Sequence, residues 1–186
     1  MSDIIIPIAI TSEMLQRART KADALGELRN SITQGAGNLA GFLGEEAMRA
    51  FLGEEATFAN TKNYDILFRG KKIDVKTKRR KAAPLDDYDC SVAAYNTQQK
   101  CDIYVFASTT YDCKMAYICG WMPHDELFEN STAMEEGQKD SNIVNGKKYE
   151  FHADCYNMKY SQLKRMDEMK NFPKLEETQV NVTPAS

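Results

Sequence analysis

The stretch from Tyr64 to Lys78 is the part of the sequence that most constrains the fold. It contains two short apolar runs, each with one aspartate inside it, on either side of the turn-like sequence Arg69-Gly70-Lys71. Apolar runs of this length around a glycine-containing turn predict two antiparallel strands. We therefore expect a β-hairpin here, with its aliphatic side chains facing a core.

The second run, Ile73-Asp74-Val75-Lys76, places an acid and a base two residues apart. Because side chains alternate between the two faces of a strand, Asp74 and Lys76 are expected on one face and the aliphatic residues on the other. Asp65, in the first run, would approach Asp74 across the hairpin. Two carboxylates and a lysine at one sheet edge suit a hard divalent cation and phosphodiester hydrolysis. The alternative is an ion pair on a solvated strand face.

Positive charge is concentrated around these residues. The whole chain has 24 Lys and Arg against 27 Asp and Glu, so the basic segment from Arg69 to Lys81 stands out from an acidic background. Such a cluster is expected of a groove that follows phosphates, with a solvated basic loop as the alternative. The residues predicted to bind nucleic acid are Arg69, Lys71, Lys72, Lys78, Arg79, Arg80 and Lys81.

A helix is predicted upstream, from Asn38 to Leu52, because its apolar residues recur at helical spacing. Asn38 is a suitable N-cap, and Gly53 is a suitable C-terminal stop. Gly41 and Gly44 lie one turn apart and lower the helix propensity, so we expect them to let the helix approach a sheet closely.

The two glutamates of this helix carry different expectations. Glu45 lies at the edge of the apolar stripe, where it could reach inward to a metal ion. Glu46 is expected to face solvent. The alternative for either residue is an ordinary exposed glutamate on a helix.

Taken together, these segments resemble the PD-(D/E)XK nuclease superfamily. The resemblance rests on Gly41-Phe42-Leu43-Gly44-Glu45, Tyr64-Asp65-Ile66-Leu67 and Ile73-Asp74-Val75-Lys76. It spans residues 38–121, and residues 101–107 look like the later core strand of such proteins. The chain departs from the common pattern in having Tyr64 where proline often precedes the first aspartate, and Asp74 where glutamate is also common.

The resemblance implies an α/β protein with a restriction-endonuclease-like core. Such a core has a central mixed β-sheet of four or five strands flanked by helices, formed from a helix, three strands, a second helix and a further strand. It also implies a domain plan with an N-terminal strand and helix extension (1–37), the nuclease core (38–121), a C-terminal elaboration of the same domain (122–172) and a flexible tail (173–186).

The roles implied by the resemblance belong to four side chains and one carbonyl group. Asp65 and Asp74 would hold Mg²⁺ or Mn²⁺, with the backbone carbonyl of Val75 as a further ligand. Lys76 would position or activate the attacking water and offset charge on the phosphate. Glu45 would hold a second metal or orient water through the first. Thr77 and Lys78 follow on the same strand and could touch phosphate.

The implied activity is that of a Mg²⁺-dependent nuclease, an endonuclease rather than an exonuclease, acting on DNA in preference to RNA. A metal-activated water would attack the phosphodiester in line, and a homodimer would provide two sites for cutting two strands. Two alternatives remain. One is a catalytically silent nucleic-acid-binding module of the same fold, and the other is a structural or interaction protein of phage or mobile-element type.

Other features set the outer bounds. A chain of 186 residues fits one domain with a sizeable core. No stretch approaches the roughly 18 apolar residues that span a bilayer, so no membrane partner is expected. The five cysteines are unpatterned and suit reduced thiols in a cytoplasmic protein.

The remaining segments are assigned more simply. Gln98 and Gln99 are expected at the surface, with a polar role near the site as the alternative. The aromatic residues Tyr149, Phe151, Tyr156 and Tyr160 are candidates for base stacking, with core or subunit packing as the more ordinary role. The expected elements are an edge strand at 4–10, a helix at 11–30, a linker at 31–37, an acidic loop at 84–89, a short helix from Ser91, strands at 102–108 and 114–121, a short helix at 123–128, a flexible loop at 131–145, a strand at 149–154 and a helical or extended end at 160–169.

Overall fold

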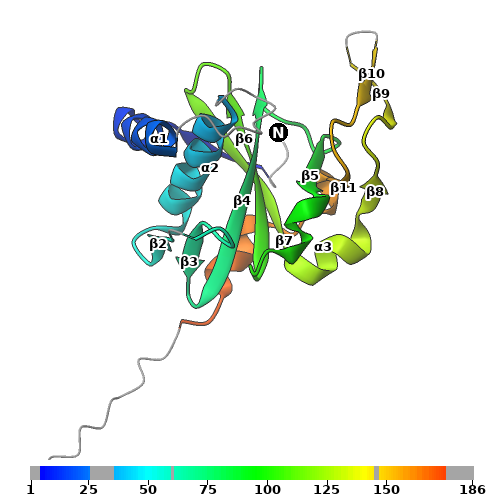
Figure 1. The fold of residues 1–186 in the computed structure, drawn as a ribbon. Coiled ribbons are helices and arrows are strands. Elements are labelled where there is room, and N and C mark those ends of the chain that lie inside the picture. Colours follow the sequence, from blue (N-terminus) through cyan, green and yellow to red (C-terminus); the bar gives the residue numbers. More distant parts are fainter. Residues whose placement is uncertain (1–4, 26–35, 60, 145–146, 175–186) are drawn as a thin grey trace, which may run out of the picture.

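The computed structural model describes residues 5–25, 36–59, 61–144 and 147–174. Within them the fold is a mixed α/β arrangement around a six-stranded sheet with the order β1-β7-β6-β4-β3-β2 (Figure 1). Its strands are β1 (Ile6–Ala9), β2 (Ala56–Phe58), β3 (Ile66–Phe68), β4 (Lys71–Arg80), β6 (Ile103–Thr110) and β7 (Met115–Pro123).

The other elements surround this sheet. The helices are α1 (Ser12–Leu25), α2 (Ala36–Leu52) and α3 (His124–Asn130), and the short 3₁₀ helices are η1 (Ala94–Gln98), η2 (Tyr160–Gln162) and η3 (Met166–Asn171). A second sheet has the order β5-β11-β8, formed by β5 (Asp89–Ala93), β11 (Cys155–Lys159) and β8 (Thr132–Met134). The strands β9 (Lys139–Val144) and β10 (Lys147–Glu150) pair with each other.

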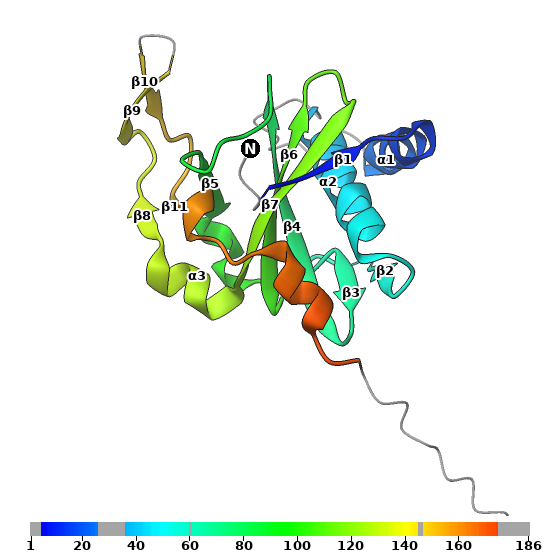
Figure 2. The ribbon, with the colours of Figure 1, turned by 180° about the vertical axis from the view of Figure 1, so that it is seen from behind.

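The main sheet has six strands, so the prediction of four or five was wrong. The additional strands are short and lie at the edges, where few residues carry a periodic signal. β1 pairs antiparallel with β7 (Figure 2), and the three-residue β2 pairs with β3. Because β1 is part of the main sheet, the segment predicted as an N-terminal extension contributes directly to the core. Pro7 lies in this edge strand, as expected of a residue that cannot donate a backbone hydrogen bond.

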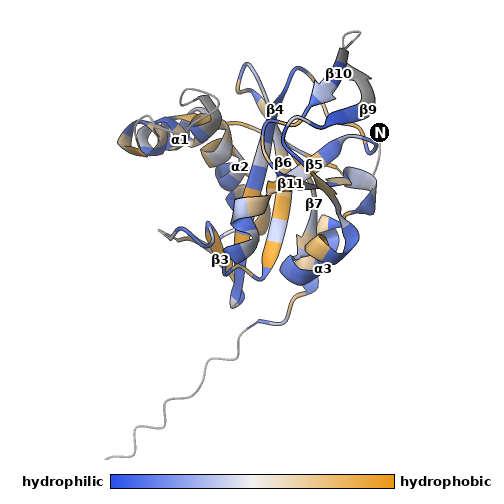
Figure 3. Ribbon diagram, turned by 45° about the vertical axis from the view of Figure 1, so that its right-hand side comes forward, coloured by the Kyte–Doolittle hydropathy of each residue, from blue (hydrophilic) through white to orange (hydrophobic). Residues whose placement is uncertain are grey.

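The core lies on both faces of β6, whose residues 103–109 are all buried. One face packs against α2 and η3, through residues such as Met48, Met166 and Met169. The other face, with Tyr104 and Phe106, packs against the second sheet and α3. Figure 3 shows hydrophobic residues in the middle of the sheet, between α2 and α3. A strand that is buried on both faces is expected to read as a continuous apolar run, as β6 does.

The hairpin formed by β3 and β4 confirms the expectation from residues 64–78. Ile66 pairs with Ile73, and Phe68 pairs with Lys71, around a turn in which Arg69 and Gly70 both have positive φ. Beyond Ile73, β4 no longer pairs with β3. It continues to Arg80, paired in parallel with β6 on its other edge. The basic segment up to Arg80 is therefore a strand and not a loop.

Several local predictions were wrong, for tertiary reasons. The short helix expected from Ser91 is instead β5 followed by η1, because Cys90 and Val92 alternate into the core. The loop expected at 131–145 contains β8 and β9, and β8 is held by pairing with β11. The strand expected at 149–154 ends at Glu150, and the buried strand is β11. In contrast, the helical or extended end expected at 160–169 is confirmed as helical, in η2 and η3.

The helix boundaries are close to expectation. α2 ends at Leu52, and Gly53 follows with φ of +80°, as a C-terminal stop requires. α2 begins at Ala36, two residues before the predicted N-cap Asn38. α1 covers 12–25 of the helix predicted over 11–30. Residues 26–30, most of the predicted linker and the tail from 175 lie outside the described residues. Among the residues that the structure describes, no helix has the length and apolar character needed to cross a bilayer.

Candidate active site

The candidate site lies where β3 ends and one edge of β4 loses its neighbour. β3 pairs with β4 only through residues 71–73, and the described residues place no strand beside the rest of that edge. Asp65 stands just before β3. Its backbone N–H donates to the carbonyl of Ile73 (2.8 Å), and its Oδ2 accepts a hydrogen bond from the backbone N–H of Val75 (2.7 Å). The Asp65 carboxylate is thus fixed against β4.

This hydrogen bond also orients Val75. In a β-strand the N–H and C=O groups of one residue point to the same edge. The Val75 carbonyl therefore faces the edge where the Asp65 carboxylate lies, as a shared ligand set would require.

Asp74 and Lys76 lie together on the face of β4 opposite to Ile73 and Val75, as the strand alternation predicted. The Asp74 side chain is buried, and its Oδ2 lies 2.6 Å from Nζ of Lys76. This oxygen is buried and accepts no other hydrogen bond from the described residues. The acid and base do form a pair, but Asp74 is only 4% exposed, so the pair does not sit on a solvated face.

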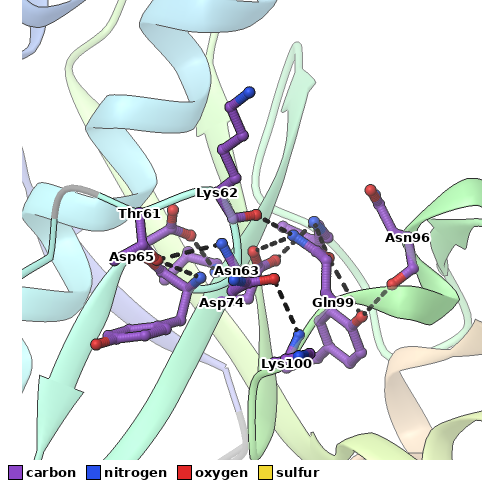
Figure 4. A network of polar contacts seen from close by, with 12 residues as sticks. Thr61, Lys62, Asn63, Asp65, Asp74, Asn96, Gln99 and Lys100 are labelled. Atoms are coloured by element: carbon purple, nitrogen blue, oxygen red, sulfur yellow. Dashed lines mark hydrogen bonds and ion pairs between the residues drawn. The ribbon is translucent and has the colours of Figure 1, made fainter.

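Gln99 links this pair, so the expected surface role is wrong for it and the alternative of a polar role near the site holds. Its Nε2 donates to Oδ1 of Asp74 (2.9 Å), and its Oε1 accepts from Nζ of Lys76 (3.1 Å). Nε2 also reaches the carbonyl of Lys62 (3.3 Å), while Lys100 N–H donates to Oδ1 of Asn63 (3.3 Å). Figure 4 shows this network, which ties the loop before β3 to the loop before β6. Gln98, in contrast, is exposed as expected.

Tyr104, on the neighbouring strand β6, extends the same hydrogen-bond network. Its hydroxyl lies 3.1 Å from the carbonyl of Asn96 and 3.2 Å from Oε1 of Gln99. The ammonium of Lys76 lies 5.6 Å from the centre of its ring, within the range of a cation–π contact. In the sequence, the only signal for the place of Gln99 at the site is that it lies just before the predicted strand at 102–108.

Glu45 reaches the site from α2. Its Oε2 lies 3.5 Å from Nζ of Lys21 on α1, and its side chain is only 13% exposed. Burial, and then the charge of Asp65, raise the pKa of Glu45 to about 8. Burial, and then the charge of Asp74, raise the pKa of Asp65 to about 6. The three acids therefore repel one another in a partly dry environment.

Glu46 does not face solvent, so that prediction was wrong. Its carboxylate is fully buried and pairs with Arg17 on α1, at 2.7 Å from Nη2 and 3.0 Å from Nε. α1 covers this part of α2, and the helical pattern alone does not show where a second helix will pack. Glu46 thus holds α1 to α2 beside the site.

Close packing of α2 on β4 brings Glu45 into place. A Cβ at Gly44 would lie 1.9 Å from Oγ1 of Thr77, so only glycine permits this approach. A Cβ at Gly41 would meet no atom within 4 Å, so the expectation of close approach is confirmed for Gly44 and wrong for Gly41.

Divalent cations prefer hard oxygen ligands, which Asp65, Asp74, Glu45 and the Val75 carbonyl would provide. Within the described ranges, no three acidic, His or Cys side chains are arranged to hold an ion by themselves. Mg²⁺ commonly binds through one or two carboxylates and keeps several waters. The donor set fits that mode: Asp74 Oδ2 is a buried carboxylate oxygen whose partner is the ammonium of Lys76, and a cation would relieve the repulsion that raises the pKa of the neighbouring acids.

The basic residues predicted to bind nucleic acid differ in exposure and in hydrogen bonding. Lys71, Lys72 and Lys81 are exposed, and Arg79 donates to the carbonyl of Tyr111 (3.3 Å). Arg69 is held by Glu55 (2.6 Å) and by the carbonyls of Lys170 and Phe172. Lys78 and Arg80 both donate to the carbonyl of Asp89.

Comparison of the sequence with known proteins does not assign the chain to a family. A scan against protein-family models found no match, and a search of curated proteins found none.

Proposed function

We propose that this chain is a metal-dependent nuclease with a restriction-endonuclease-like core, hydrolysing phosphodiester bonds of nucleic acid, with DNA favoured over RNA. One observation carries the proposal: Asp65, just before β3, and Asp74, on β4, lie with Lys76 at the free edge of β4. The order α2, β2, β3, β4 and β6 supports it, because it follows the expected helix, three strands and later strand. The 3₁₀ helix η1 stands where that pattern has its second helix.

The proposed ligands of Mg²⁺ or Mn²⁺ are Asp65, Asp74 and the Val75 carbonyl, with Glu45 close enough to add a further oxygen or orient water. The ion would supply charge to offset the phosphate oxygens and would make water a stronger nucleophile at neutral pH.

Lys76 would act on the phosphate directly. Its ammonium is already held by Asp74 and Gln99, so it needs little reorganisation to donate to an oxygen of the scissile phosphate or to the attacking water. Burial and the charge of Asp65 raise the pKa of Glu45 to about 8 in the metal-free protein, so binding of a cation beside it would favour release of that proton.

The exposed lysines would hold the nucleic acid backbone. Lys71 and Lys72 lie at the start of β4, and Lys81 follows its end, so they are placed on both sides of the acids along one strand. The five cysteines are unpaired, which supports a reducing compartment such as the cytoplasm.

A catalytically silent nucleic-acid-binding module is the second candidate. Two observations favour it. Gln99 already hydrogen-bonds to both Asp74 and Lys76, and among the described residues no three acidic, His or Cys side chains are arranged to hold an ion. Against it, binding alone does not require buried acids beside a phosphate-binding surface.

Cleavage assays separate the two candidates. Labelled duplex, single-stranded, flap and junction DNA, and RNA, are incubated with Mg²⁺ or Mn²⁺ and either wild type, Lys76→Met or Lys114→Met. The nuclease proposal expects cleavage by wild type, a loss of at least about 100-fold in Lys76→Met, and near-normal cleavage by Lys114→Met, whose side chain is exposed and has no proposed role at the site. Binding of any of these substrates without cleavage supports the silent module. Neither binding nor cleavage contradicts both candidates.

A further inference from the structure

A cavity of about 410 Å³ opens beside Lys76, on the side of β4 that faces the second sheet. Its walls come from β4, β5, β6, η1, the start of η2 and the segment from Tyr149 to Cys155. Figure 1 shows β5 to one side of β4, with β11 next to β5. Small-molecule sites typically have volumes of about 300–1,000 Å³, so the cavity suits one nucleotide and not a stretch of duplex. None of the roles proposed above uses it.

One wall of the cavity carries two cations. Lys76 and Lys78 are two residues apart on the same face of β4 and both line the cavity. At about 3.3 Å per residue, their Cα atoms are about 7 Å apart. An ammonium has three donors, and the described residues give Nζ of Lys78 one hydrogen bond, to the carbonyl of Asp89 at 3.2 Å. Lys78 can therefore donate to an anion in the cavity.

The rim of the cavity carries two tyrosine rings that are not buried in the hydrophobic core. Tyr95, at the start of η1, is 79% exposed, and Tyr149 is 47% exposed, yet both line the cavity. Phe151 is buried and meets the ring of Tyr149 edge-on, with centroids 5.2 Å apart. Exposed tyrosines beside a cationic wall are the combination by which proteins stack unpaired bases while holding their phosphates.

The other aromatic candidates have packing roles. Tyr160 is 1% exposed, and Tyr156 packs edge-on against Phe128. The ordinary explanation of core packing thus holds for these two, whereas Tyr149 and Tyr95 remain available to a ligand.

We propose that this cavity is a subsite for one unpaired nucleotide of the substrate, next to the phosphate that Lys76 contacts. Lys78 binds the phosphate of that nucleotide, and Tyr95 and Tyr149 stack on its base. Because Lys76 lines both the cavity and the candidate active site, the two are continuous. The placement beside a scissile phosphate rests on the proposed nuclease function. The substrate is then single-stranded, or carries an unpaired or extrudable nucleotide at the cleavage point.

Binding is tested first, without metal. A fluorescent oligothymidine of five nucleotides is titrated, in EDTA, into wild type, Tyr95→Ala, Lys78→Met and the control Tyr111→Ala. Tyr111 is a 55% exposed tyrosine on the turn between β6 and β7 that does not line the cavity. Stacking is worth about 1–3 kcal/mol per base, so Tyr95→Ala should weaken binding about 5- to 150-fold, with Tyr111→Ala unchanged. Thermal unfolding of each variant checks that it is folded, and Tyr95→Ala, at an exposed position, remains informative if Lys78→Met is not.

Cleavage is tested second, with Mg²⁺, on a fully paired duplex and the same duplex with one unpaired nucleotide. We expect faster cleavage of the second substrate, and loss of that preference in Tyr95→Ala. Equal binding by wild type, Tyr95→Ala and Lys78→Met overturns the subsite, and cleavage by wild type would then leave the nuclease proposal standing. Binding that depends on Tyr95 without any cleavage supports a nucleotide pocket and contradicts the nuclease proposal.

Discussion

Helix α2 carries two glycines one turn apart, and the structure predicts opposite effects of alanine at the two positions. At Gly44 the new Cβ would lie 1.9 Å from Oγ1 and 3.1 Å from Cβ of Thr77, so rotating the hydroxyl away still leaves a tight contact. Overpacking of this kind costs about 1–3 kcal/mol. At Gly41 the new Cβ meets nothing within 4 Å. Both variants gain about 1 kcal/mol of helix propensity.

Because the helix gain is common to both, the difference between the variants isolates the contact with Thr77. Gly41→Ala should stabilise the protein, and Gly44→Ala should be about 1–3 kcal/mol less stable than Gly41→Ala. For a chain of this size, 1 kcal/mol shifts the unfolding temperature by about 2–4 °C. The assay is equilibrium unfolding in urea, supported by thermal unfolding.

A double variant tests the cause of the difference. Oγ1 of Thr77 is buried and has no hydrogen-bond partner among the described residues, so Thr77→Ala removes the obstacle without breaking a hydrogen bond. Gly44→Ala should be less harmful in the Thr77→Ala background, with a coupling of about 1 kcal/mol or more. If Gly44→Ala stabilises the wild type as much as Gly41→Ala does, the close packing of α2 on β4 is wrong.

Three further predictions concern charges and hydrogen bonds. Arg17→Ala should destabilise the protein by about 3 kcal/mol, because it leaves the buried carboxylate of Glu46 without its closest partner. Glu46→Ala should cost less, because the remaining Arg17 side chain is 45% exposed and can be hydrated. Urea unfolding measures both variants. Burial raises the pKa of Glu45 to about 8, so the folded protein holds a proton that the unfolded chain releases. Stability in EDTA should therefore fall as pH rises from about 6 to 8, by no more than about 3 kcal/mol, and Glu45→Gln should flatten that fall in urea unfolding. Gln99→Ala should lower the cleavage rate about 10- to 100-fold, because Gln99 orients both Asp74 and Lys76, and single-turnover cleavage measures this.

Each of these predictions has a result that would count against it. Equal destabilisation by Arg17→Ala and Glu46→Ala would mean that the carboxylate is hydrated and not buried. A parallel pH dependence in wild type and Glu45→Gln would show that another group is responsible. Normal cleavage by Gln99→Ala would leave Gln99 as a purely structural bridge between two loops.

The sequence predicted the hairpin, helix α2 and the meeting of Asp65 with Asp74, because each follows from local periodicity or from pairing across one turn. It did not predict the burial of Glu46, and it gave the place of Gln99 at the site only as an alternative to the surface. Both depend on contacts with segments far away in the chain: Glu46 is covered by α1, and Gln99 is placed by the loop before β6.

The polar strands were missed for a related reason. β8 is short and its residues are mostly exposed, so no hydrophobic alternation marks it. Its structure comes from pairing with β11, in which Thr132 lies opposite Asn157. Backbone pairing with a distant strand leaves little trace in the composition of a three-residue segment.

The most direct test of the account is the Mn²⁺ dependence of single-turnover cleavage by wild type, Asp74→Asn and the control Asp112→Asn. Asp112 lies on the exposed turn after β6, where its carboxylate contacts Thr110 and the backbone of Lys114. We predict cleavage that rises with Mn²⁺ and saturates in wild type and in Asp112→Asn, and no detectable cleavage by folded Asp74→Asn at any Mn²⁺ concentration. Cleavage by Asp74→Asn at the wild-type rate, or wild-type cleavage that persists in EDTA, would contradict the claim that the acids on β4 form a metal-dependent nuclease site.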